Sequence, residues 1–489
     1  MSRQPTISLH IDKEIHRTRS RNSTHDFWLE RAKSAIKKLL AKFRKNKEQM
    51  KYIISAIILA AVSCLEASGG GPMRVAFVGD PQVDNAVEMG YARRSIYKEL
   101  AGRGDIDLCL FLGDLVNDDM ALLPESVRII DSLPFPCLMV PGNHDRDVYR
   151  GQKARPRDLA TWRRTLGYID TAFFMGNVRF ILMNNVRRAA SGMTDYTGGF
   201  TEKQKHWLDS VFHALPEQGR EGTRKQDVAK TGSSTQRPAL TILATHIPVS
   251  QMKGRDSLTA MIPDPSRTLF VSGHTHYVSR SYVSIDSTGG EFADSIPELV
   301  AGAACGSWWR GVKDSDGIPY ALQSCGAPRC YFTADISRNG TYRLTYKRIG
   351  RPAPEQLSVW ATYDKPAAQA ADSTRFRLYV NVYGGASDGE VTVSVPKKFS
   401  RPSGNIFCRK SSAPAPKVEE VVRFNASMSR DYRKAHRDEF IPLRLKPSTH
   451  LWESPPLTGP VPAYVNVRYH DRFMKIESRI ETSRHRHGR

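Results

Sequence analysis

The stretch LCLFLGDLVND at residues 108–118 decides the fold of this chain. Its apolar, β-favouring part at 108–112 runs directly into Gly113-Asp114, so a buried strand is predicted to end where a turn and a carboxylate begin. Four more short polar islands follow apolar runs in the same way. These islands are Gly79-Asp80-Pro81-Gln82, Gly142-Asn143-His144-Asp145, Thr245-His246 and Gly273-His274-Thr275-His276. Because strand ends meet at one edge of an open α/β sheet, the islands together predict a metal site.

The islands contain the ligands that a pair of divalent metal ions requires. Hydrolysis of a phosphate ester at neutral pH needs a strong nucleophile and stabilisation of negative charge. Two divalent ions about 3.5–4 Å apart supply both, with a bridging hydroxide as the attacking group. Asp114 is the best candidate for the bridging carboxylate, because the glycine before it lets the backbone turn sharply. The other candidate ligands are Asp80, Asn143, His246, His274 and His276. A single Gly-Asp after a strand is usually only a turn, but five islands in this order predict catalysis.

This order of motifs resembles the calcineurin-like metallophosphoesterase superfamily. The blocks of that family read Asp-x-His, Gly-Asp-x-x, Gly-Asn-His-Asp/Glu, a lone His and Gly-His-x-His. The resemblance implies a four-layer α/β/β/α sandwich. It implies that His144 contacts the phosphate and protonates the leaving oxygen, steered by Asp145. The implied ligands are Asp80, Asp114 and His276 for one metal, and Asp114, Asn143, His246 and His274 for the other.

The first block departs from the family pattern, because Gln82 stands where a metal-ligating histidine is usual. A carbonyl oxygen is a harder and weaker ligand than an imidazole, so we expect two divalent ions with Mn²⁺ preferred and with Mg²⁺, Fe or Zn²⁺ as alternatives. Asn117, where many members have Asp, is predicted to hold the neighbouring loop, a role that Asp118 could share.

Four residues are candidates for the substrate side of the site. The segment AACGSWWRG at 303–311 resembles a branch of exported bacterial metallophosphoesterases with a C-terminal β domain. Its two tryptophans either plug the core beneath the site or wall the substrate cleft. The arginine after the third island could pair with phosphate oxygens or form a surface ion pair. The four candidates are Asn117, Arg146, Trp308 and Trp309.

The pattern along the chain predicts two domains after residue 68. Residues 69–345 alternate short apolar strands with amphipathic stretches, which predicts the metallophosphoesterase domain. Residues 346–489 show alternating segments such as 376–383 and 390–395, which predict a smaller β-rich domain with a sandwich fold. Residues 215–238 are predicted to form a surface loop. Helices are expected within 94–100, 122–133, 158–166 and 202–214.

The start of the chain predicts export. An apolar run at 53–64 is preceded by lysines and followed by small residues, so residues 50–68 are interpreted as a signal peptide. The run is short of the roughly 20 residues that a transmembrane helix needs. A lipid anchor on Cys64 or a retained membrane segment is the alternative. The basic segment 1–49 would then lie upstream of the true start, and the protein would be periplasmic or on the cell surface.

Charge and cysteine content add two expectations. The chain has 72 Lys+Arg and 50 Asp+Glu, a net charge of +22, of which residues 1–51 contribute +9 with 14 basic and 5 acidic residues. The rest is only moderately basic and has no aromatic-interleaved basic stripe, so nucleic acid is not expected as a partner. Cys305, Cys325 and Cys330 could form one bridge in an oxidising compartment or remain buried thiols.

These observations lead to one expected function and one alternative. The expected function is an exported dinuclear-metal phosphoesterase that hydrolyses phosphate mono- or diesters by attack of a metal-bridging hydroxide. Its substrate would be a phosphorylated small molecule, an envelope sugar phosphate or a lipid head group. The alternative is a catalytically weak surface protein whose β domain binds a glycan or a protein partner.

Overall fold

The computed structural model describes most of the chain after residue 70. The described residues are 71–147, 158–188, 196–214, 237–285, 295–320, 322–363, 375–394, 422–423, 450–454, 457–458 and 460–484. The predicted upstream segment 1–49, the predicted signal peptide 50–68 with Cys64, and residues 215–236 of the predicted loop lie outside them.

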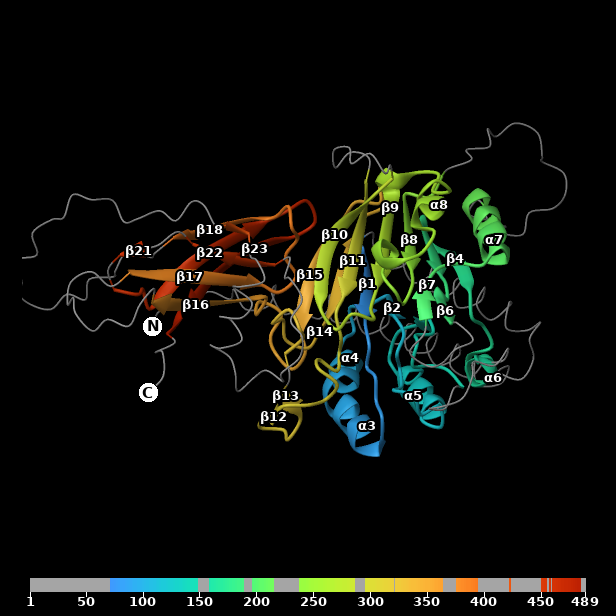
Figure 1. Cartoon of the computed structure of the whole chain (residues 1–489), viewed down its shortest axis with the longest axis horizontal. Coiled ribbons are helices and arrows are strands. Elements are labelled where there is room, and N and C mark those ends of the chain that lie inside the picture. The colour runs from blue at the N-terminus through green and yellow to red at the C-terminus, as the bar shows by residue number, and fades with distance from the viewer. Residues whose placement is uncertain are drawn as a thin grey trace, which may run out of the picture.

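Two mixed sheets form the centre of the larger part of the chain (Figure 1). The strands of the first sheet are β1 (Met73–Val78), β2 (Leu108–Phe111), β3 (Cys137–Met139), β14 (Cys330–Ile336) and β15 (Tyr342–Arg348). The strands of the second are β4 (Thr171–Met175), β5 (Val178–Leu182), β8 (Leu240–Ala244), β9 (Thr268–Ser272), β10 (Val278–Ser284) and β11 (Ser295–Ala301). The strand orders are β15-β14-β1-β2-β3 and β10-β11-β9-β8-β5-β4. β1, β2 and β3 are parallel to one another, and so are β5, β8, β9 and β11.

Alternation along the strands explains why the two sheets pack face to face. In β1, Val75 and Phe77 belong to the apolar cluster between the sheets, whereas Ala76 and Val78 belong to the cluster on the outer face of the first sheet. Successive strand residues point to opposite faces, and all four of these residues are fully buried, so helices must cover the outer face.

Helices cover both outer faces. On the first sheet they are α3 (Ala86–Ala92), the π-helical turn η1 (Arg93–Tyr97), α4 (Lys98–Ala101), α5 (Leu123–Ile130) and α6 (Ala160–Leu166). On the second they are α7 (Glu202–His213) and α8 (Arg255–Thr259), with the 3₁₀ turns η2 (Val249–Gln251) and η3 (Pro265–Arg267) nearby. The start of α7 is fixed by a capping box between Thr201 and Gln204. The predicted helical stretches and the predicted four-layer α/β/β/α sandwich are confirmed, although the first helix begins earlier, at the N-cap Asn85.

The C-terminal part is built from strands, as predicted. They are β16 (Leu357–Tyr363), β17 (Arg375–Val382), β18 (Glu390–Ser394), β19 (Val422–Arg423), β20 (Leu451–Glu453), β21 (Leu457–Thr458), β22 (Tyr464–His470), β23 (Lys475–Glu481) and β24 (Ser483–Arg484). They form one sheet of order β19-β20-β17-β16-β24 and one of order β18-β22-β23. Their apolar faces belong to the cluster that also fills the space between the first two sheets. The predicted boundary at residue 345 falls inside β15, and the division into domains at that residue stays a prediction.

Two smaller expectations concern thiols and the membrane. The described cysteines, Cys109, Cys137, Cys305, Cys325 and Cys330, are all free, so the last three are buried thiols and form no bridge. Among the described residues, no helix is long and apolar enough to cross a membrane.

Candidate metal centre

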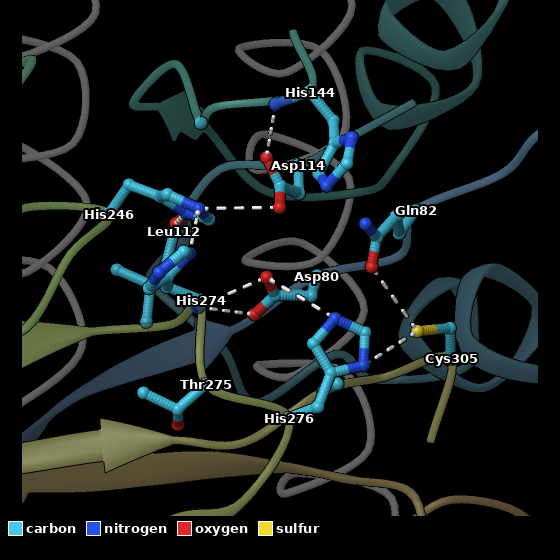
Figure 2. A network of polar contacts seen from close by, with 12 residues as sticks. Asp80, Gln82, Leu112, Asp114, His144, His246, His274, Thr275, His276 and Cys305 are labelled. Atoms are coloured by element: carbon cyan, nitrogen blue, oxygen red, sulfur yellow. Dashed lines mark hydrogen bonds and ion pairs between the residues drawn. The ribbon is translucent and has the colours of Figure 1, made fainter. Parts of the chain in front are cut away.

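The five islands lie after the carboxyl ends of five strands. Figure 2 shows labelled side chains from all five islands around one point. Asp80 follows β1, Asp114 follows β2, and Asn143 follows β3, while His246 follows β8 and the His274–His276 pair follows β9. β1, β2 and β3 are parallel, and so are β8 and β9, so each sheet brings its loops to one edge. The packing of the sheets then brings the two sets of loops together.

His246 is the centre of one half of the site. Its Nδ1 donates to the carbonyl oxygen of Leu112 at 2.8 Å, which leaves Nε2 to face the other ligands. This Nε2 lies 2.9 Å from Asn143 Oδ1, 3.3 Å from Asp114 Oδ2 and 3.1 Å from His274 Nδ1. Four ligand atoms of the type that binds divalent metals therefore converge within contact distance.

The donor set fits a metal ion. One ligand atom from each of Asp114, His246 and His274 lies within 4.8 Å of the others. His246 and Asp114 are fully buried, where an unpaired carboxylate is costly and a cation must balance it. Burial disfavours the charged form of His246, but the carboxylate of Asp114 outweighs it and raises the pKa of His246 to about 9. Burial, together with the charge of His246, lowers the pKa of His274 to about 3. A divalent ion here would supply the positive charge that the imidazolium of His246 otherwise provides.

Asp80 and His276 form the other half of the site. Both carboxylate oxygens of Asp80 accept from the backbone N–H of His274, at 3.0 and 2.9 Å. His276 Nδ1 donates to the carbonyl oxygen of Gly306 at 2.9 Å, so its Nε2 faces the site and lies 4.0 Å from Asp80 Oδ1. Burial raises the pKa of Asp80 well above its ordinary value, because the buried carboxylate has too little positive charge around it within the protein.

Gln82 lies next to this half of the site and is held by Asn117. Gln82 Nε2 donates to Asn117 Oδ1 at 3.2 Å, so the amide oxygen of Gln82 is the atom left to act as a ligand. That oxygen lies 4.0 Å from the Sγ of buried Cys305. The structure places Asn117 behind Gln82, as the prediction of a loop-holding residue requires, and not on the substrate side of the site.

His144 is oriented by Asp118 and not by Asp145, which corrects the expectation from the motif. His144 Nδ1 lies 2.9 Å from Asp118 Oδ1, and its backbone N–H donates to Asp114 Oδ1 at 2.9 Å. Burial disfavours charge on His144, but the carboxylates of Asp114 and Asp118 outweigh it and raise the pKa to about 9. Asp145 instead points beneath the loops, where its carboxylate accepts from the backbone N–H groups of Val116 at 3.1 Å and Gly142 at 2.9 Å.

Arg146 is a structural residue, which corrects its assignment to the substrate side. Its side chain is only 4 % exposed, and its guanidinium forms an ion pair with Asp158. It also donates to Asn184 Oδ1 at 2.8 Å and to the carbonyl oxygen of Val186 at 3.1 Å. Its Nε also donates to the carbonyl oxygen of Gly142 at 3.3 Å, so the guanidinium is occupied by partners within the protein.

The two tryptophans have different roles. Trp309 is 4 % exposed, and its Nε1 donates to the carbonyl oxygen of Pro81 at 2.9 Å, so it plugs the core beneath the first island. Trp308 is half-buried and stacks on the ring of His276, with centroids 4.2 Å apart and planes inclined by 17°. It therefore supports the imidazole plane of a candidate ligand and forms the edge of the site.

Sequence reasoning did not single out Tyr196. This half-buried residue opens β7 (Tyr196–Gly198), which pairs with β6 (Val186–Arg188), and its ring meets the ring of His274 edge-on at 5.7 Å. Its local sequence, Asp195-Tyr196-Thr197-Gly198, has no motif and no strong periodicity. The only signal in the sequence is a short β-favouring pair before two glycines.

Comparisons with known proteins place the chain in a family. Residues 73–278 match the calcineurin-like phosphoesterase family, and residues 298–476 match the family described as the C terminal of calcineurin-like phosphoesterase. The chain therefore belongs to the calcineurin-like phosphoesterases, a family of metal-dependent phosphoester hydrolases. The predicted resemblance to the calcineurin-like metallophosphoesterases, with a C-terminal domain, is confirmed.

Two solved structures are similar to the chain at low identity. One is the purple acid phosphatase PPD1 from seeds of yellow lupin (Lupinus luteus), with 14 % identity, a TM-score of 0.38, and coverage of 57 % of this chain and 52 % of that one. The other is PhoD, with 12 % identity, a TM-score of 0.36, and coverage of 64 % and 70 %. This chain thus spans about half the length of the lupin enzyme. A search of curated proteins found no match.

Proposed function

We propose that the protein is an exported phosphoesterase that uses two divalent metal ions to hydrolyse phosphate mono- or diesters. The observation that carries the proposal is the convergence of candidate ligands from the ends of five strands in two sheets. All of them offer carboxylate, amide oxygen or imidazole donors, which suit first-row divalent ions and Mg²⁺. The family match supports the same reaction class.

The two halves of the site would each hold one ion. The proposed ligands are Asp114, Asn143, His246 and His274 for the first ion, and Asp80, Gln82, Asp114 and His276 for the second. When bound, the ions would help to generate an oxygen nucleophile at neutral pH and would stabilise the charge on the phosphoryl oxygens. We propose Mn²⁺ as the preferred metal, because Gln82 supplies a hard oxygen donor where an imidazole is usual.

His144 is proposed to act on the substrate. With Nδ1 held by Asp118, the Nε2–H of the ring is free to donate to a phosphoryl oxygen or to the leaving oxygen. Burial disfavours charge on this ring, but its hydrogen bond and charge interaction with Asp118 favour the protonated form, which suits a proton donor. The leaving oxygen would take this proton as its bond to phosphorus breaks, so no free alkoxide would be released.

We propose export and an envelope substrate from the sequence before residue 70. The apolar run at 53–64 and its small-residue flank support secretion, or anchoring to a membrane through the same segment. A phosphorylated small molecule, an envelope sugar phosphate or a lipid head group would then be the substrate class. Cell fractionation with identification of the mature N-terminus tests this proposal. A cytoplasmic protein that retains residues 1–49 would contradict it.

The activity is tested by metal reconstitution. The full chain is stripped of metal, supplied with Mn²⁺, Mg²⁺, Fe²⁺ or Zn²⁺, and assayed with a chromogenic phosphomonoester and phosphodiester. We expect metal-dependent turnover that Asp114→Asn abolishes and His144→Ala lowers by about 10²–10⁴-fold. The preferred ester then narrows the substrate class.

Matched controls separate chemistry from folding. His213→Ala and Asp209→Asn change the same residue types on the exposed side of α7, at 74 % and 60 % side-chain exposure, and should leave turnover unchanged. No turnover with any metal by a folded protein would overturn the proposal. It would favour the alternative of a surface binding protein.

A further inference from the structure

The β6–β7 hairpin forms a wall beside the metal ligands. Its base is fixed to the loop that carries His246: the side-chain amide of Asn185 donates to the carbonyl oxygen of Ile247 at 2.7 Å and accepts from the N–H of Ile247 at 3.1 Å. Gly198, the last residue of β7, lies so close to this loop that a Cβ there would be 2.9 Å from Ile247 and Met252. The base of the strand pair is therefore fixed to the loop that carries His246.

Tyr196 is the residue of this hairpin that faces the site. Its ring meets His274 at 5.7 Å with planes inclined by 76°, so the imidazole lies against the edge or face of the phenol. Three carboxylates, those of Asp114, Asp118 and Asp80, are near enough to act electrostatically on its hydroxyl. These same carboxylates surround the proposed metal pair and His144.

Within the described part of the chain, the hydroxyl of Tyr196 takes part in none of the hydrogen bonds that hold the site together. Hydrogen bonds within the described residues account for His246, His276 and His144, yet none of them involves this hydroxyl, and the residue is half-buried. A partly exposed phenol beside a site for an anion is well suited to donate a hydrogen bond to it, since a tyrosine has an ordinary pKa near 10 and stays protonated at neutral pH.

We propose that Tyr196 is a substrate-contacting residue whose hydroxyl donates a hydrogen bond to a non-bridging phosphoryl oxygen of the ester. This inference rests on the proposed phosphoesterase activity. The residue opposite Tyr196 on β6 is Arg188. Residues directly opposite each other in an antiparallel pair lie on the same face of the strands, so the Arg188 side chain is next to the Tyr196 ring. The phenol therefore stands on a wall of the site, against the ring of the candidate ligand His274.

The experiment compares Tyr196→Phe, Tyr196→Ala and the wild type as full chains loaded with Mn²⁺. Phenylalanine keeps the ring against His274 and removes only the hydroxyl, whereas alanine removes both. Tyr464→Phe, on an exposed tyrosine of β22 with 45 % exposure, is the matched control. Each variant is measured for kcat and KM, for bound metal per chain, and for binding of orthovanadate by the shift in melting temperature.

We expect Tyr196→Phe to lower kcat by about 100-fold, the usual loss when one donor to a reacting oxyanion is removed. KM and bound metal should stay close to the wild-type values, and orthovanadate should bind at least tenfold more weakly. The loss should be similar for aryl esters whose leaving groups differ in pKa, because the contact is with a non-bridging oxygen. Tyr464→Phe should match the wild type.

Two other results would overturn the inference, and a third would refute the proposed function. Tyr196→Phe with wild-type kcat and orthovanadate binding, beside an impaired Tyr196→Ala, would show that the ring only supports His274. An effect that grows with the leaving-group pKa would move the hydroxyl to the leaving oxygen. A wild-type protein that binds orthovanadate without turnover would refute the proposed function, and the binding comparison would still decide whether Tyr196 contacts the anion.

Discussion

Breaking the ion pair between Arg280 and Asp471 should destabilise both parts of the chain. Arg280 lies on β10, and Asp471 lies between β22 and β23. The guanidinium donates to the two carboxylate oxygens at 2.6 and 2.9 Å and to the carbonyl oxygen of Gly384 at 3.0 Å. The side chains are 4 % and 0 % exposed. The pair therefore fixes the C-terminal sheet of β18, β22 and β23 to the second sheet, next to the stacked rings of Tyr342 and Phe473.

The expected magnitude follows from what each substitution leaves behind. Removing one partner of a buried ion pair costs about 3–5 kcal/mol, because the other charge stays buried without compensation. The loss of unfolding free energy in Asp471→Asn should lie at the upper end of this range, because the substitution leaves Arg280 charged and buried. Arg280→Met should fall at the lower end, about 3 kcal/mol. Asp471 would still accept from the backbone N–H groups of Phe473 and Met474 and from the Tyr469 hydroxyl.

Urea unfolding of the full chain measures this loss. The apolar cluster runs through both parts of the chain, so we expect one shared transition whose midpoint falls in both variants. Arg93→Met breaks an exposed pair with Glu125, at 47 % and 37 % side-chain exposure, and should cost less than about 1 kcal/mol. A loss below about 1 kcal/mol for Asp471→Asn would refute the reasoning, as would a loss confined to one of two separate transitions.

The pH dependence of the same pair has a definite sign. Burial opposes ionisation of Asp471, but its hydrogen bond and charge interaction with Arg280 outweigh burial and lower its pKa. A carboxylate with a lowered pKa stabilises the fold above its unfolded pKa of about 3.9, and this contribution is lost as the pH falls towards the folded value. The difference in unfolding free energy between the wild type and Arg280→Met should therefore have its largest value at neutral pH and should decrease below about pH 4.

Three more substitutions test the site. Asp118→Asn should lower the pKa of His144 from about 9. The alkaline limb of the pH–rate profile should therefore move to lower pH. Superimposable profiles would show that Asp118 does not act on His144. Gln82→His should raise the share of Zn²⁺ retained after dialysis against equal Mn²⁺ and Zn²⁺, because imidazole is the softer ligand, and an unchanged metal ratio would exclude Gln82 as a ligand. Arg146→Met should destabilise the fold by about 2–3 kcal/mol through its buried pair with Asp158 and leave KM near the wild-type value; a large rise in KM would restore Arg146 to the substrate side.

The site could be located from the sequence because every island follows the end of a predicted buried strand. Alternating apolar residues fix where each buried strand ends, and parallel strands bring those ends to one edge. Asp114, His246 and His274 are far apart in sequence, yet their ligand atoms lie within 4.8 Å of one another. Strand ends alone therefore predicted which residues come together, and their assignment as ligands stays a prediction that reconstitution tests.

The direction of side chains within the loops could not be predicted in the same way. Asp145 follows His144 directly in the chain, whereas Asp118 belongs to the second island. Both are aspartates, so the residue type does not show which carboxylate reaches the ring of His144. In the structure it is Asp118 that reaches the ring, with Oδ1 2.9 Å from His144 Nδ1, from a backbone with a φ of +69° in the left-handed region. Asp145 turns inward because the N–H groups of Val116 and Gly142 need an acceptor there. Arg146, next in the chain, turns towards its buried partners for a similar reason.

Backbone strain explains why the conformations of these loops could not be predicted from local residue preferences. Within the described residues, the non-glycine residues with positive φ are Asp80, Gln82, Asp114, Asp118, His274, His276, Trp308 and Trp309. Every one of them lies in the site or in the loop beneath it. Each such residue costs on the order of 1 kcal/mol relative to the right-handed region, so the strain is concentrated where the candidate ligands are.

The surrounding structure is built to hold that strain. The N–H of Cys305 donates to the carbonyl oxygen of Asp80 at 3.1 Å, and the N–H of Gln82 donates to that of Asp114 at 2.8 Å. A Cβ on Gly142 would lie 2.0 Å from Asp114 Oδ1, so only glycine lets the two islands approach. A glycine at the strained positions would relieve the backbone but would remove the ligand. The strained conformations are therefore the consequence of placing carboxylates and imidazoles at tight turns between rigid strands, which is what a preorganised metal centre requires.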